Sequence, residues 1–337
     1  MTTGSANHGY STAMRRIPPH HPAATRPHDR RRFVDLTILA ALLILLLAPC
    51  LSPAAEVIDQ DGTRIRFDRP FSRIISLYPA HTENLVELGA TTAIIGVSRG
   101  ENPDAVADRK TFSDSDSAEK YLAAQPDLVL VRPMISRANP ALLARLRESG
   151  IRVVSLQPTD AEGMFLYWRT LGELTGRTAE AESMRQRFLA AVAEIERKIP
   201  ESDPGRRPGV YVESIHSKMK TFSPTSMTIY AVESAGGRNI ATDAKPRNNS
   251  NIAEYGKERI LSRADEIEIF LSQTGRMNPI DLDTLKKEPG FQLIRAFREN
   301  RVYLINETEV ARPTMRLIAG IEHLHQLFYP TAKEAQQ

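Results

Sequence analysis

The sequence contains a single cysteine, Cys50, among its 337 residues. One thiol excludes both an internal disulfide and a metal site built from several thiolates. Histidine is scarce as well: four of the eight lie in the first 50 residues, which leaves His81, His216, His323 and His325 for the rest of the chain. The last two stand two positions apart on a predicted helix, so their side chains diverge. The sequence therefore gives little support to a site for a free metal ion.

Several signatures of catalysis are also missing. The chain has no G-x-x-x-x-G-K-[ST] phosphate loop, no G-x-G-x-x-G fingerprint, no G-x-S-x-G elbow and no H-E-x-x-H zinc motif. Nor does any set of acid, base and nucleophile stand at the spacing of a known motif. We therefore expect no enzymatic activity and no cofactor.

An excess of positive charge is absent from most of the chain. The net charge is +3, yet the first 50 residues hold six Arg and two Asp, which leaves 38 basic and 39 acidic residues beyond them, a net of −1. A chain without a basic body has no electrostatic footprint for nucleic acid. We therefore expect no nucleic-acid partner.

The first 55 residues read as a leader. Residues 1–35 show no apolar period and are predicted to be disordered, whereas Leu36–Ala48 is an almost unbroken apolar run. Basic residues Arg30–Arg32 precede this run and the small residues 52–55 follow it, which is the order of an export signal. The run is short for a membrane span, although a signal anchor that stays in place is the alternative. Either way, we expect a periplasmic protein.

Cys50 ends the apolar run. The sequence Leu47-Ala48-Pro49-Cys50 resembles a lipoprotein box, in which the cysteine is lipidated and becomes the first residue, although Pro49 departs from that pattern. We therefore expect an exported chain, with a lipid on Cys50 or a signal cleaved after it as alternatives.

A long helix is predicted in the middle of the chain, over residues 178–199. Gly176 ends the element before it and Pro200 ends the helix itself. At about 1.5 Å per residue, its length is roughly 33 Å, the width of a small domain. Its large apolar residues recur every three or four positions and so share one face: Met184, Phe188, Val192, Ile195 and Ile199.

Short predicted strands and helices alternate on both sides of this helix, which is typical of an α/β fold with largely parallel sheets. We therefore expect two Rossmann-like α/β lobes joined by a single long helix, with a ligand cleft between the lobes. The predicted divisions are a leader (1–55), an N-terminal lobe (56–158), linking helices (159–199), a C-terminal lobe (200–311) and a C-terminal helix and tail (312–337).

The two halves contain an internal repeat. Residues 119–130 and 258–269 share a leading glutamate, a leucine three positions on, an acid at +8 and aliphatic residues at +9 and +11. After each unit come a helix ending in Arg-Glu and a strand beginning with Arg-Val, in the same order, which suggests lobes of similar build. The leading residues, Glu119 and Glu258, also have structural interpretations. Glu119 fits a capping box with Asp116, and Glu258 lies in a first helical turn, where the helix dipole favours any acid.

Ligands of α/β sheets bind at the carboxyl ends of the strands. The residues predicted there are aromatic or cationic for the most part, which suits a bulky ligand carrying carboxylates or a chelated metal. Ordinary solvated loops are the alternative for about half of them, and His81 has the alternative role of orienting a turn. The candidates are Tyr78, Pro79, His81, Ser98, Arg99, Arg132, His216, Phe222 and Arg312.

Residues 56–328 resemble the class III periplasmic binding proteins of ABC importers, which capture cobalamin, ferric siderophores or haem. The motifs that carry the resemblance include RIISLYPAHTENLVELGA, IIGVS, EKYLAAQPDLVL, LRESGIRVVSL, LGELTGR, AGGRNI, KERILSRADEI and ARPTMRLIAGIEHL. The resemblance implies two lobes rigidly joined by one helix, and a monomer that serves a permease dimer in the inner membrane. It also implies that Glu119 and Glu258 dock on arginines of that permease.

The resemblance does not name the ligand. Tyr78 or His81 could ligate haem iron, and Arg99 and Arg132 could pair with carboxylates or iron-bound oxygens of a siderophore. The cationic character of the set favours an iron complex over a corrinoid. A chelatase-like enzyme or metallochaperone on the same fold is the alternative function, and a binder of free metal ions is a third interpretation.

Overall fold

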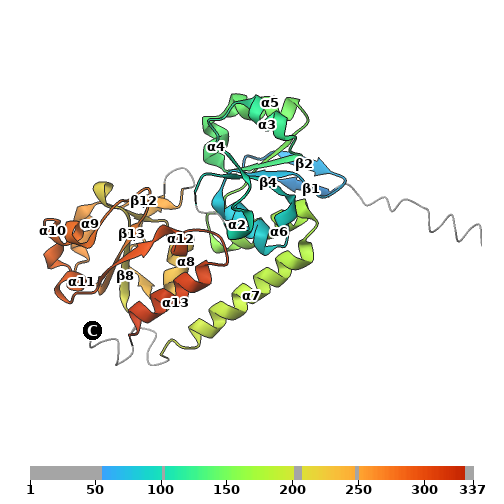
Figure 1. The fold of residues 1–337 in the computed structure, drawn as a ribbon. Coiled ribbons are helices and arrows are strands. Elements are labelled where there is room, and N and C mark those ends of the chain that lie inside the picture. The colour runs from blue at the N-terminus through green and yellow to red at the C-terminus, as the bar shows by residue number, and fades with distance from the viewer. Residues whose placement is uncertain (1–54, 101–102, 201–206, 247–249, 331–337) are drawn as a thin grey trace, which may run out of the picture. The chain divides into compact units, whose positions relative to one another are not determined.

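The computed structural model describes residues 55–100, 103–200, 207–246 and 250–330 (Figure 1). The predicted leader up to residue 54, including its apolar run and Cys50, lies outside these residues. Within the described part of the chain, no helix combines the length and the apolar character that crossing a membrane requires.

The described chain begins with the predicted hairpin. Strands β1 (Ala55–Ile58) and β2 (Arg64–Phe67) pair antiparallel around an Asp-Gly turn. Gly62 has φ +79°, a conformation that glycine adopts without strain. The Asp59 carboxylate accepts hydrogen bonds from the backbone N–H groups of Asp61 and Thr63, which closes the turn.

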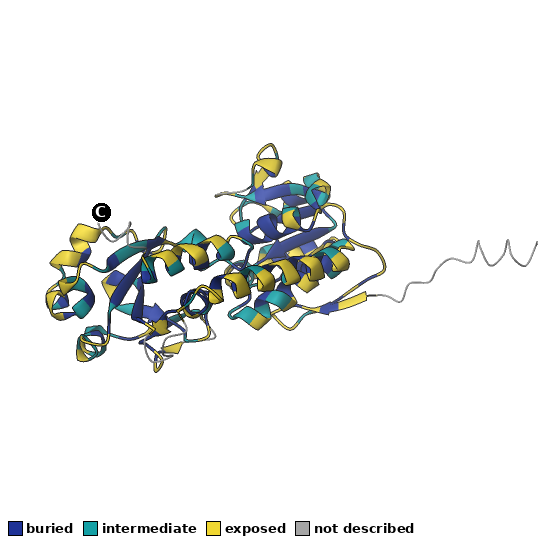
Figure 2. Ribbon diagram, turned by 90° about the horizontal axis from the view of Figure 1, so that it is seen from below, coloured by how far each residue is buried: buried dark blue, intermediate teal, exposed yellow. Residues whose placement is uncertain are grey.

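The N-terminal lobe (residues 55–158) contains a five-stranded parallel sheet in the order β5-β4-β3-β6-β7. All residues of β3 and β6 are buried, because helices cover both faces of the sheet (Figure 2). The strands are β3 (Ile74–Ser76), β4 (Ile94–Ser98), β5 (Lys110–Phe112), β6 (Leu128–Val131) and β7 (Arg152–Ser155). The helices are α2 (Pro79–Glu87), α3 (Ala118–Ala124), α4 (Pro133–Ala138) and α5 (Pro140–Glu148), with 3₁₀ turns at Thr91–Ala93 and Asp104–Val106.

Two helices follow, α6 (Ala161–Thr175) and α7 (Thr178–Glu196). Gly176 ends α6 with φ +69°, and α7 is the predicted long helix, ending three residues earlier than expected. The two helices approach closely at Gly172, where a Cβ atom would lie 2.8 Å from the Ala181 side chain. Apolar residues of α7 are buried at the predicted spacing, namely Met184, Phe188, Val192 and Ile195.

The C-terminal lobe (residues 207–330) contains a mixed sheet in the order β11-β12-β9-β8-β13-β14, with β10 paired to β8. Strands β8, β13 and β14 are parallel, as predicted, whereas β9, β12 and β11 form an antiparallel edge that was not predicted. The strands are β8 (Gly209–Ile215), β9 (Lys220–Phe222), β10 (Arg238–Asn239), β11 (Lys245–Pro246), β12 (Ile252–Glu254), β13 (Ile269–Thr274) and β14 (Val302–Asn306). The helices are α8 (Met227–Ser234), α9 (Lys257–Ser262), α10 (Leu282–Lys287), α11 (Arg295–Arg298), α12 (Glu307–Val310) and α13 (Leu317–Phe328), with 3₁₀ turns at His216–Lys218 and Phe291–Leu293.

The internal repeat corresponds to equivalent elements of the two lobes. In the first unit α3 leads into β6, which pairs with β3, the first strand of the sheet, and with β7. In the second unit α9 leads into β13, which pairs with β8 and with β14 in the same parallel arrangement. The repeated sequence therefore marks the central strand of each lobe and the helix before it.

One continuous apolar core extends through both lobes and the helices between them. It includes Ile74 of β3, Phe188 of α7 and Val212 of β8. The ring of Phe188 stacks on Tyr230 of α8, with centroids 6.4 Å apart. Separate cores lie on the other face of each sheet. Because the shared core crosses the predicted domain boundaries, those boundaries stay a prediction.

Candidate functional site

Tyr78 and Arg132 form a stacked pair at the carboxyl ends of two neighbouring strands. Each residue follows its strand, β3 or β6, and directly precedes a proline that opens a helix. Proline suits the first helical position and holds the residue before it in an extended conformation, so both side chains are presented in the same way. The Arg132 guanidinium lies over the Tyr78 ring, 4.4 Å from its centroid. Tyr78 lies at the end of a strand, as predicted, and is the N-cap residue of α2.

The electrostatics of this pair favour a neutral phenol beside a permanent cation. Burial raises the pKa of Tyr78, and the positive charge of Arg132 opposes part of that rise. The buried Nε of Arg132 has no hydrogen-bond partner in the described chain. Buried donors are nearly always hydrogen-bonded in proteins, so an acceptor on a bound ligand would account for this Nε–H group.

His81 is buried behind this pair, and its environment argues against the predicted role as an iron ligand. Its ring is 0% exposed. One nitrogen, Nε2, lies 3.1 Å from the Val131 carbonyl oxygen, which only accepts, so Nε2 carries the proton. Nδ1 then accepts from the Tyr167 hydroxyl at 2.7 Å. Burial lowers the pKa of His81 to about 3, which keeps the ring neutral.

With both nitrogens occupied, His81 holds Tyr78 in place rather than contacting a ligand. The two rings meet edge to face, with centroids 5.1 Å apart. Orientation of the start of α2 was the alternative role for His81, and this geometry agrees with it. The predicted N-cap, Thr82, lies inside α2, and its hydroxyl donates to the Ser76 hydroxyl instead.

Arg312, predicted to contact the ligand from the second lobe, crosses to the first lobe. Its guanidinium donates to Glu83 of α2 at 2.9 Å, and the Arg316 guanidinium lies 3.1 Å from the other Glu83 oxygen. The Glu83 side chain is 7% exposed and that of Arg312 is 14% exposed. Both residues of this ion pair affect the pKa of Tyr78, although less than burial and Arg132 do: Arg312 lowers it and Glu83 raises it. The Glu83–Arg312 ion pair therefore lies near Tyr78 and Arg132.

A second bridge runs through the backbone carbonyl of Pro313. This oxygen accepts from the Asn84 side-chain amide and from the Trp168 indole N–H, each at 2.9 Å. Sequence reasoning missed Glu83, Asn84 and Trp168 as lobe-bridging residues. One feature of the sequence could have indicated this role. Glu83 and Asn84 are polar residues at buried positions of the short helix α2, where apolar residues are usual.

The loop after β4 reaches the same edge of the N-terminal sheet. Gly100 has φ +132°, and a Cβ atom there would lie 3.5 Å from the Pro79 ring. Ser98 is half-buried and Arg99 is exposed. Lys120 chiefly, and Arg99 more weakly, lower the pKa of Asp116. The structure thus gathers Tyr78, Pro79, Ser98, Arg99, Arg132 and Arg312 around one edge.

Phe222 does not join this set. It lies on β9 opposite Ile252 and is 3% exposed within the shared apolar core. Its burial in this core argues against the predicted role as a ligand contact, which stays a prediction. A three-residue antiparallel strand is too short to show a pattern in the sequence, so Phe222 was assigned to a loop.

His216 belongs to a polar network inside the C-terminal lobe. Its Nδ1 lies 2.9 Å from Oε1 of Glu213, whose side chain is fully buried and whose other oxygen accepts from the Ser272 hydroxyl at 2.8 Å. Its Nε2 lies 3.4 Å from Glu288, which pairs with Lys257 at the start of α9. The hydrogen bond with Glu213 raises the pKa of His216. These contacts explain the position of His216 without a ligand.

Glu119 and Glu258 are both exposed in the first turns of α3 and α9. The predicted capping box is not formed, because Ser117 rather than Asp116 is the N-cap of α3. The backbone N–H of Glu119 itself and the Ser117 hydroxyl lower the pKa of Glu119. Each lobe therefore presents one exposed carboxyl side chain at the same place in the repeat. Among the described residues, no group of three or more His, Cys, Asp or Glu is arranged to hold a metal ion.

Comparison with known proteins identifies relatives across most of the chain. A cobalamin-binding protein of Halobacterium salinarum is 25% identical over 326 residues, covering 90% of this chain and 86% of the relative. An uncharacterised ABC transporter substrate-binding lipoprotein of Bacillus subtilis is 23% identical, covering 88% of this chain and 98% of the relative.

Among solved structures, a possible iron-binding (periplasmic solute-binding) protein of Staphylococcus epidermidis superimposes with a TM-score of 0.68 and 25% identity. The match covers 77% of this chain and 100% of the Staphylococcus epidermidis chain. The family model described as periplasmic binding protein matches residues 74–308, more than half of the chain. The chain therefore belongs to the periplasmic binding protein family, as a binding protein and not an enzyme.

Proposed function

We propose that this protein captures an iron complex, a ferric siderophore or haem, and delivers it to the permease of an ABC importer. A corrinoid is the alternative ligand, because one relative is named a cobalamin-binding protein. The solved structure described as a possible iron-binding protein supports the iron complex. The protein acts as a monomer and transfers its ligand without chemistry.

The observation that carries the proposal is the Tyr78–Arg132 pair. An aromatic face and a guanidinium at 4.4 Å from its centroid provide both a stacking surface and a fixed cation. Guanidinium groups recognise carboxylates in a planar, bidentate geometry, and a buried Nε without a partner leaves a donor for that purpose. Haem propionates and siderophore oxygens offer such acceptors.

Delivery is assigned to Glu119 and Glu258. The two carboxylates occupy equivalent positions in the repeat, so they match a permease dimer that presents the same basic pocket twice. Charge complementarity of this kind guides encounter and fixes orientation more than it adds affinity. Docking therefore depends on the pair and not on either residue alone.

The location of the protein is assigned to the periplasmic side of the inner membrane. The order of the leader supports export, and the lipoprotein relative supports a lipid on Cys50. Metabolic labelling with a palmitate analogue tests this assignment: label on the native chain but not on Cys50→Ser supports the anchor, and an unlabelled native chain opposes it.

Thermal unfolding of the purified protein with haem, cobalamin and a panel of ferric siderophores tests the choice of ligand. A ligand at 100 times its Kd adds about 2.7 kcal/mol to the free energy of unfolding, which is a clear rise in Tm. A shift with an iron complex supports the proposal. A shift with cobalamin alone selects the corrinoid, and no shift with any compound overturns the proposed ligand class.

A further inference from the structure

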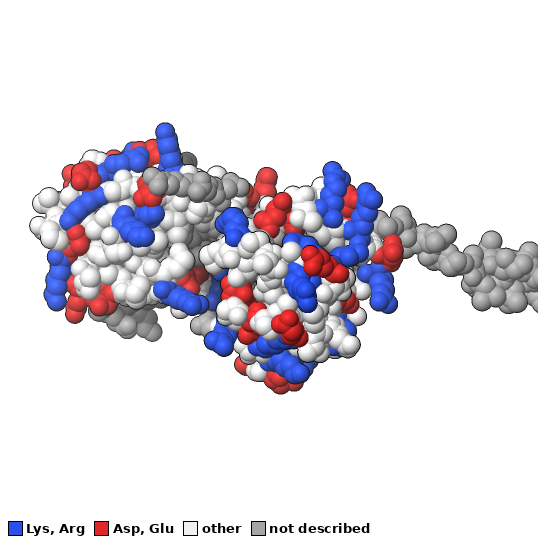
Figure 3. All heavy atoms as spheres, turned by 90° about the horizontal axis from the view of Figure 1, so that it is seen from above, with Lys and Arg blue, Asp and Glu red and all other residues white. Residues whose placement is uncertain are grey.

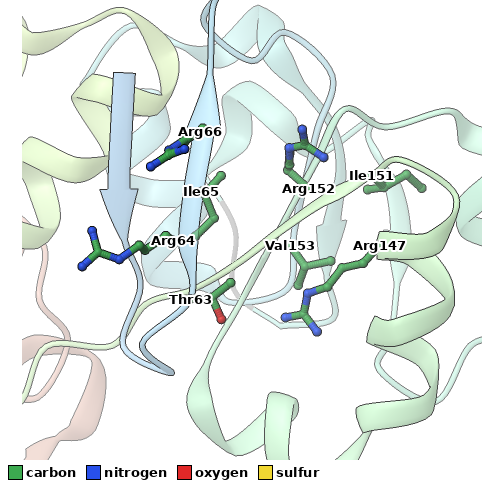
Figure 4. Close-up of a pocket in the computed structure, with 8 residues that line it drawn as sticks. All are labelled: Thr63, Arg64, Ile65, Arg66, Arg147, Ile151, Arg152 and Val153. Atoms are coloured by element: carbon green, nitrogen blue, oxygen red, sulfur yellow. The ribbon is translucent and has the colours of Figure 1, made fainter. Parts of the chain in front are cut away.

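A groove lies on the N-terminal lobe between strand β2 of the hairpin and the start of the edge strand β7, whereas Tyr78 and Arg132 lie at the carboxyl ends of the strands (Figure 4). Its volume is about 570 Å³, within the range of small-molecule sites. Four arginines line it: Arg64 and Arg66 come from β2, Arg152 from β7 and Arg147 from the last turn of α5. Apolar side chains form its floor, namely Ile65, Ile151 and Val153.

The positive charge of this groove is only partly balanced. Glu56 lies opposite Arg66 on the paired strand, and its carboxylate accepts from Arg64 at 2.8 Å and from Arg66 at 2.6 Å. Arg147 and Arg152 are exposed and form no ion pair within the described chain. Figure 4 shows the Arg64 and Arg66 side chains extending toward β1, where Glu56 pairs with both, and away from Arg147 and Arg152. The unbalanced positive charge of the groove therefore comes from Arg147 and Arg152.

A second hollow continues this basic surface along β2. It has a volume of about 470 Å³ and adds Arg69, together with Asp68 and Asp127. The Asp127 carboxylate is occupied by the backbone N–H groups of Ser72 and Arg73, at 2.9 Å each. Figure 3 shows blue side chains gathered on this part of the molecule, near the point where the described chain begins.

The position of the groove in the chain points to its occupant. Strand β1, which pairs with β2, begins at Ala55, five residues after Cys50 and seven after the last residue of the apolar run, Ala48. At no more than about 3.6 Å per residue, these tethers reach roughly 18 Å and 25 Å. A lipid on Cys50 and a retained signal anchor therefore both keep the hairpin beside a bilayer surface.

The groove and the proposed docking residue Glu119 involve neighbouring helices of the N-terminal lobe. Helix α5, which carries Arg147, packs against α3, which carries Glu119. Hydrogen bonds from the Glu119 backbone N–H and the Ser117 side chain are the main causes of the lowered pKa of Glu119. The positive charge of Arg145, which is also on α5, lowers this pKa more weakly. Glu119 lies in the first turn of α3 and Arg147 in the last turn of α5, so the docking carboxylate and the groove lie toward opposite ends of these two neighbouring helices.

We propose that the β2–β7 groove binds the phosphate headgroups of anionic phospholipids on the membrane that holds the protein. This proposal rests on the membrane location given under the proposed function. Arginine binds phosphate oxygens in a bidentate geometry, and the negative surface potential of an anionic bilayer attracts basic residues that lie near it.

The test uses the full chain, produced with its own leader and reconstituted into nanodiscs of phosphatidylcholine alone or with phosphatidylglycerol. Phenylglyoxal modifies exposed arginines, and mass spectrometry follows the rate at Arg147 and Arg152. We expect modification several-fold slower in the phosphatidylglycerol discs, and equal rates in both discs at high salt, which screens surface attraction. Arg276, exposed on the C-terminal lobe, serves as the internal reference with equal rates throughout.

Three results overturn the proposal: equal rates at Arg147 and Arg152 in the two kinds of disc, recovery of the chain free of the discs, or equal protection by inorganic phosphate in phosphatidylcholine discs. The last result would assign the groove to free phosphate. Binding of dihexanoyl-phosphatidylglycerol in calorimetry provides a second measurement. It should weaken about tenfold or more in R147E/R152E, but not in K286E/K287E on the exposed face of α10.

Neither readout involves the transported ligand, so failure of the groove proposal is distinguishable from failure of the proposed function. A protein that shows no melting shift with any iron complex can still show lipid-dependent protection of Arg147. Conversely, R147E/R152E should keep the ligand-induced rise in Tm of the native chain, because the groove lies apart from Tyr78 and Arg132.

Discussion

Glu83 of the N-terminal lobe and Arg312 of the C-terminal lobe are joined by an ion pair of 2.9 Å, although 229 residues separate them. The pair lies beside Tyr78 and next to the Pro313 carbonyl that receives Asn84 and Trp168. Together with the shared core along α7, these contacts fix one lobe against the other at the edge that carries the candidate site. The contacts between the lobes therefore position the candidate site as much as either sheet does.

Replacing Glu83 with glutamine should destabilise the protein by about 3 kcal/mol, because it removes the buried carboxylate that pairs with both Arg312 and Arg316. Urea denaturation measures the loss. E87Q, on the same helix, is the matched control: Glu87 pairs with Arg187 at the surface, where such pairs contribute about 1 kcal/mol or less. Equal losses in the two variants would contradict the assigned role of the buried bridge.

Arg132→Lys should weaken ligand binding about tenfold or more, since a lysine keeps the charge but loses the planar stack on Tyr78 and the bidentate geometry. Titration of the ligand found by the thermal screen measures the effect. R137K, on the exposed face of the same helix, should bind as the native chain does. Unchanged affinity in R132K would remove the pair from the ligand site.

Reversing both docking charges, in E119R/E258R, should abolish ligand delivery while leaving ligand affinity unchanged. The reason is that repulsion at two equivalent permease pockets prevents docking, whereas both residues lie apart from the ligand site. Uptake of labelled ligand by cells measures delivery. E148R/E266R carries the same charge change on exposed residues of the two lobes and should transport normally; transport by E119R/E258R at the native rate would refute the docking role.

The sequence predicted the elements that have a strong local signal. The long helix was predictable because its apolar residues recur every three or four positions over many turns, and the hairpin because Asp61-Gly62 suits a tight turn. The antiparallel edge of the C-terminal sheet was not, because strands such as Lys245–Pro246 have two residues and no period. Because this edge was not predicted, the burial of Phe222 on β9 was not predicted either.

The site was predictable only in part, for a similar reason. Arg132 and Tyr78 follow from a general rule, because ligands bind where parallel strands end. The partner of Arg312 does not follow from any local pattern, since Glu83 reaches it only after both lobes have folded. Likewise, nothing near His81 in the sequence shows that Tyr167 and Val131 occupy both of its ring nitrogens.

His216 should make the protein less stable as the pH rises. Its hydrogen bond with Glu213 raises the pKa of His216 in the folded state above 6.5. The stabilisation is complete below the unfolded pKa and is lost as the pH rises through the higher folded pKa. Urea denaturation from pH 6 to pH 9 should show this decline in the native chain and in H323Q, which changes an exposed histidine of α13. The decline should disappear in H216Q; a decline of the same size there would assign it to another group.

His81 should act in the opposite direction and in a different pH range. Burial lowers its pKa from 6.5 to about 3, so the unfolded chain takes up a proton below pH 6.5 while the folded chain does not. Stability should therefore fall with pH between about 6.5 and 3, with a slope of at most about 1.4 kcal/mol per pH unit from this residue. H81Q removes the titrating group, so it should show a flatter acid limb even though it is less stable at pH 7. H325Q, a half-buried histidine on α13, is the control for loss of a histidine in general. If H81Q kept the native slope below pH 6.5, the acid sensitivity would arise elsewhere, and the ring of His81 would not be the neutral support that holds Tyr78 against Arg132.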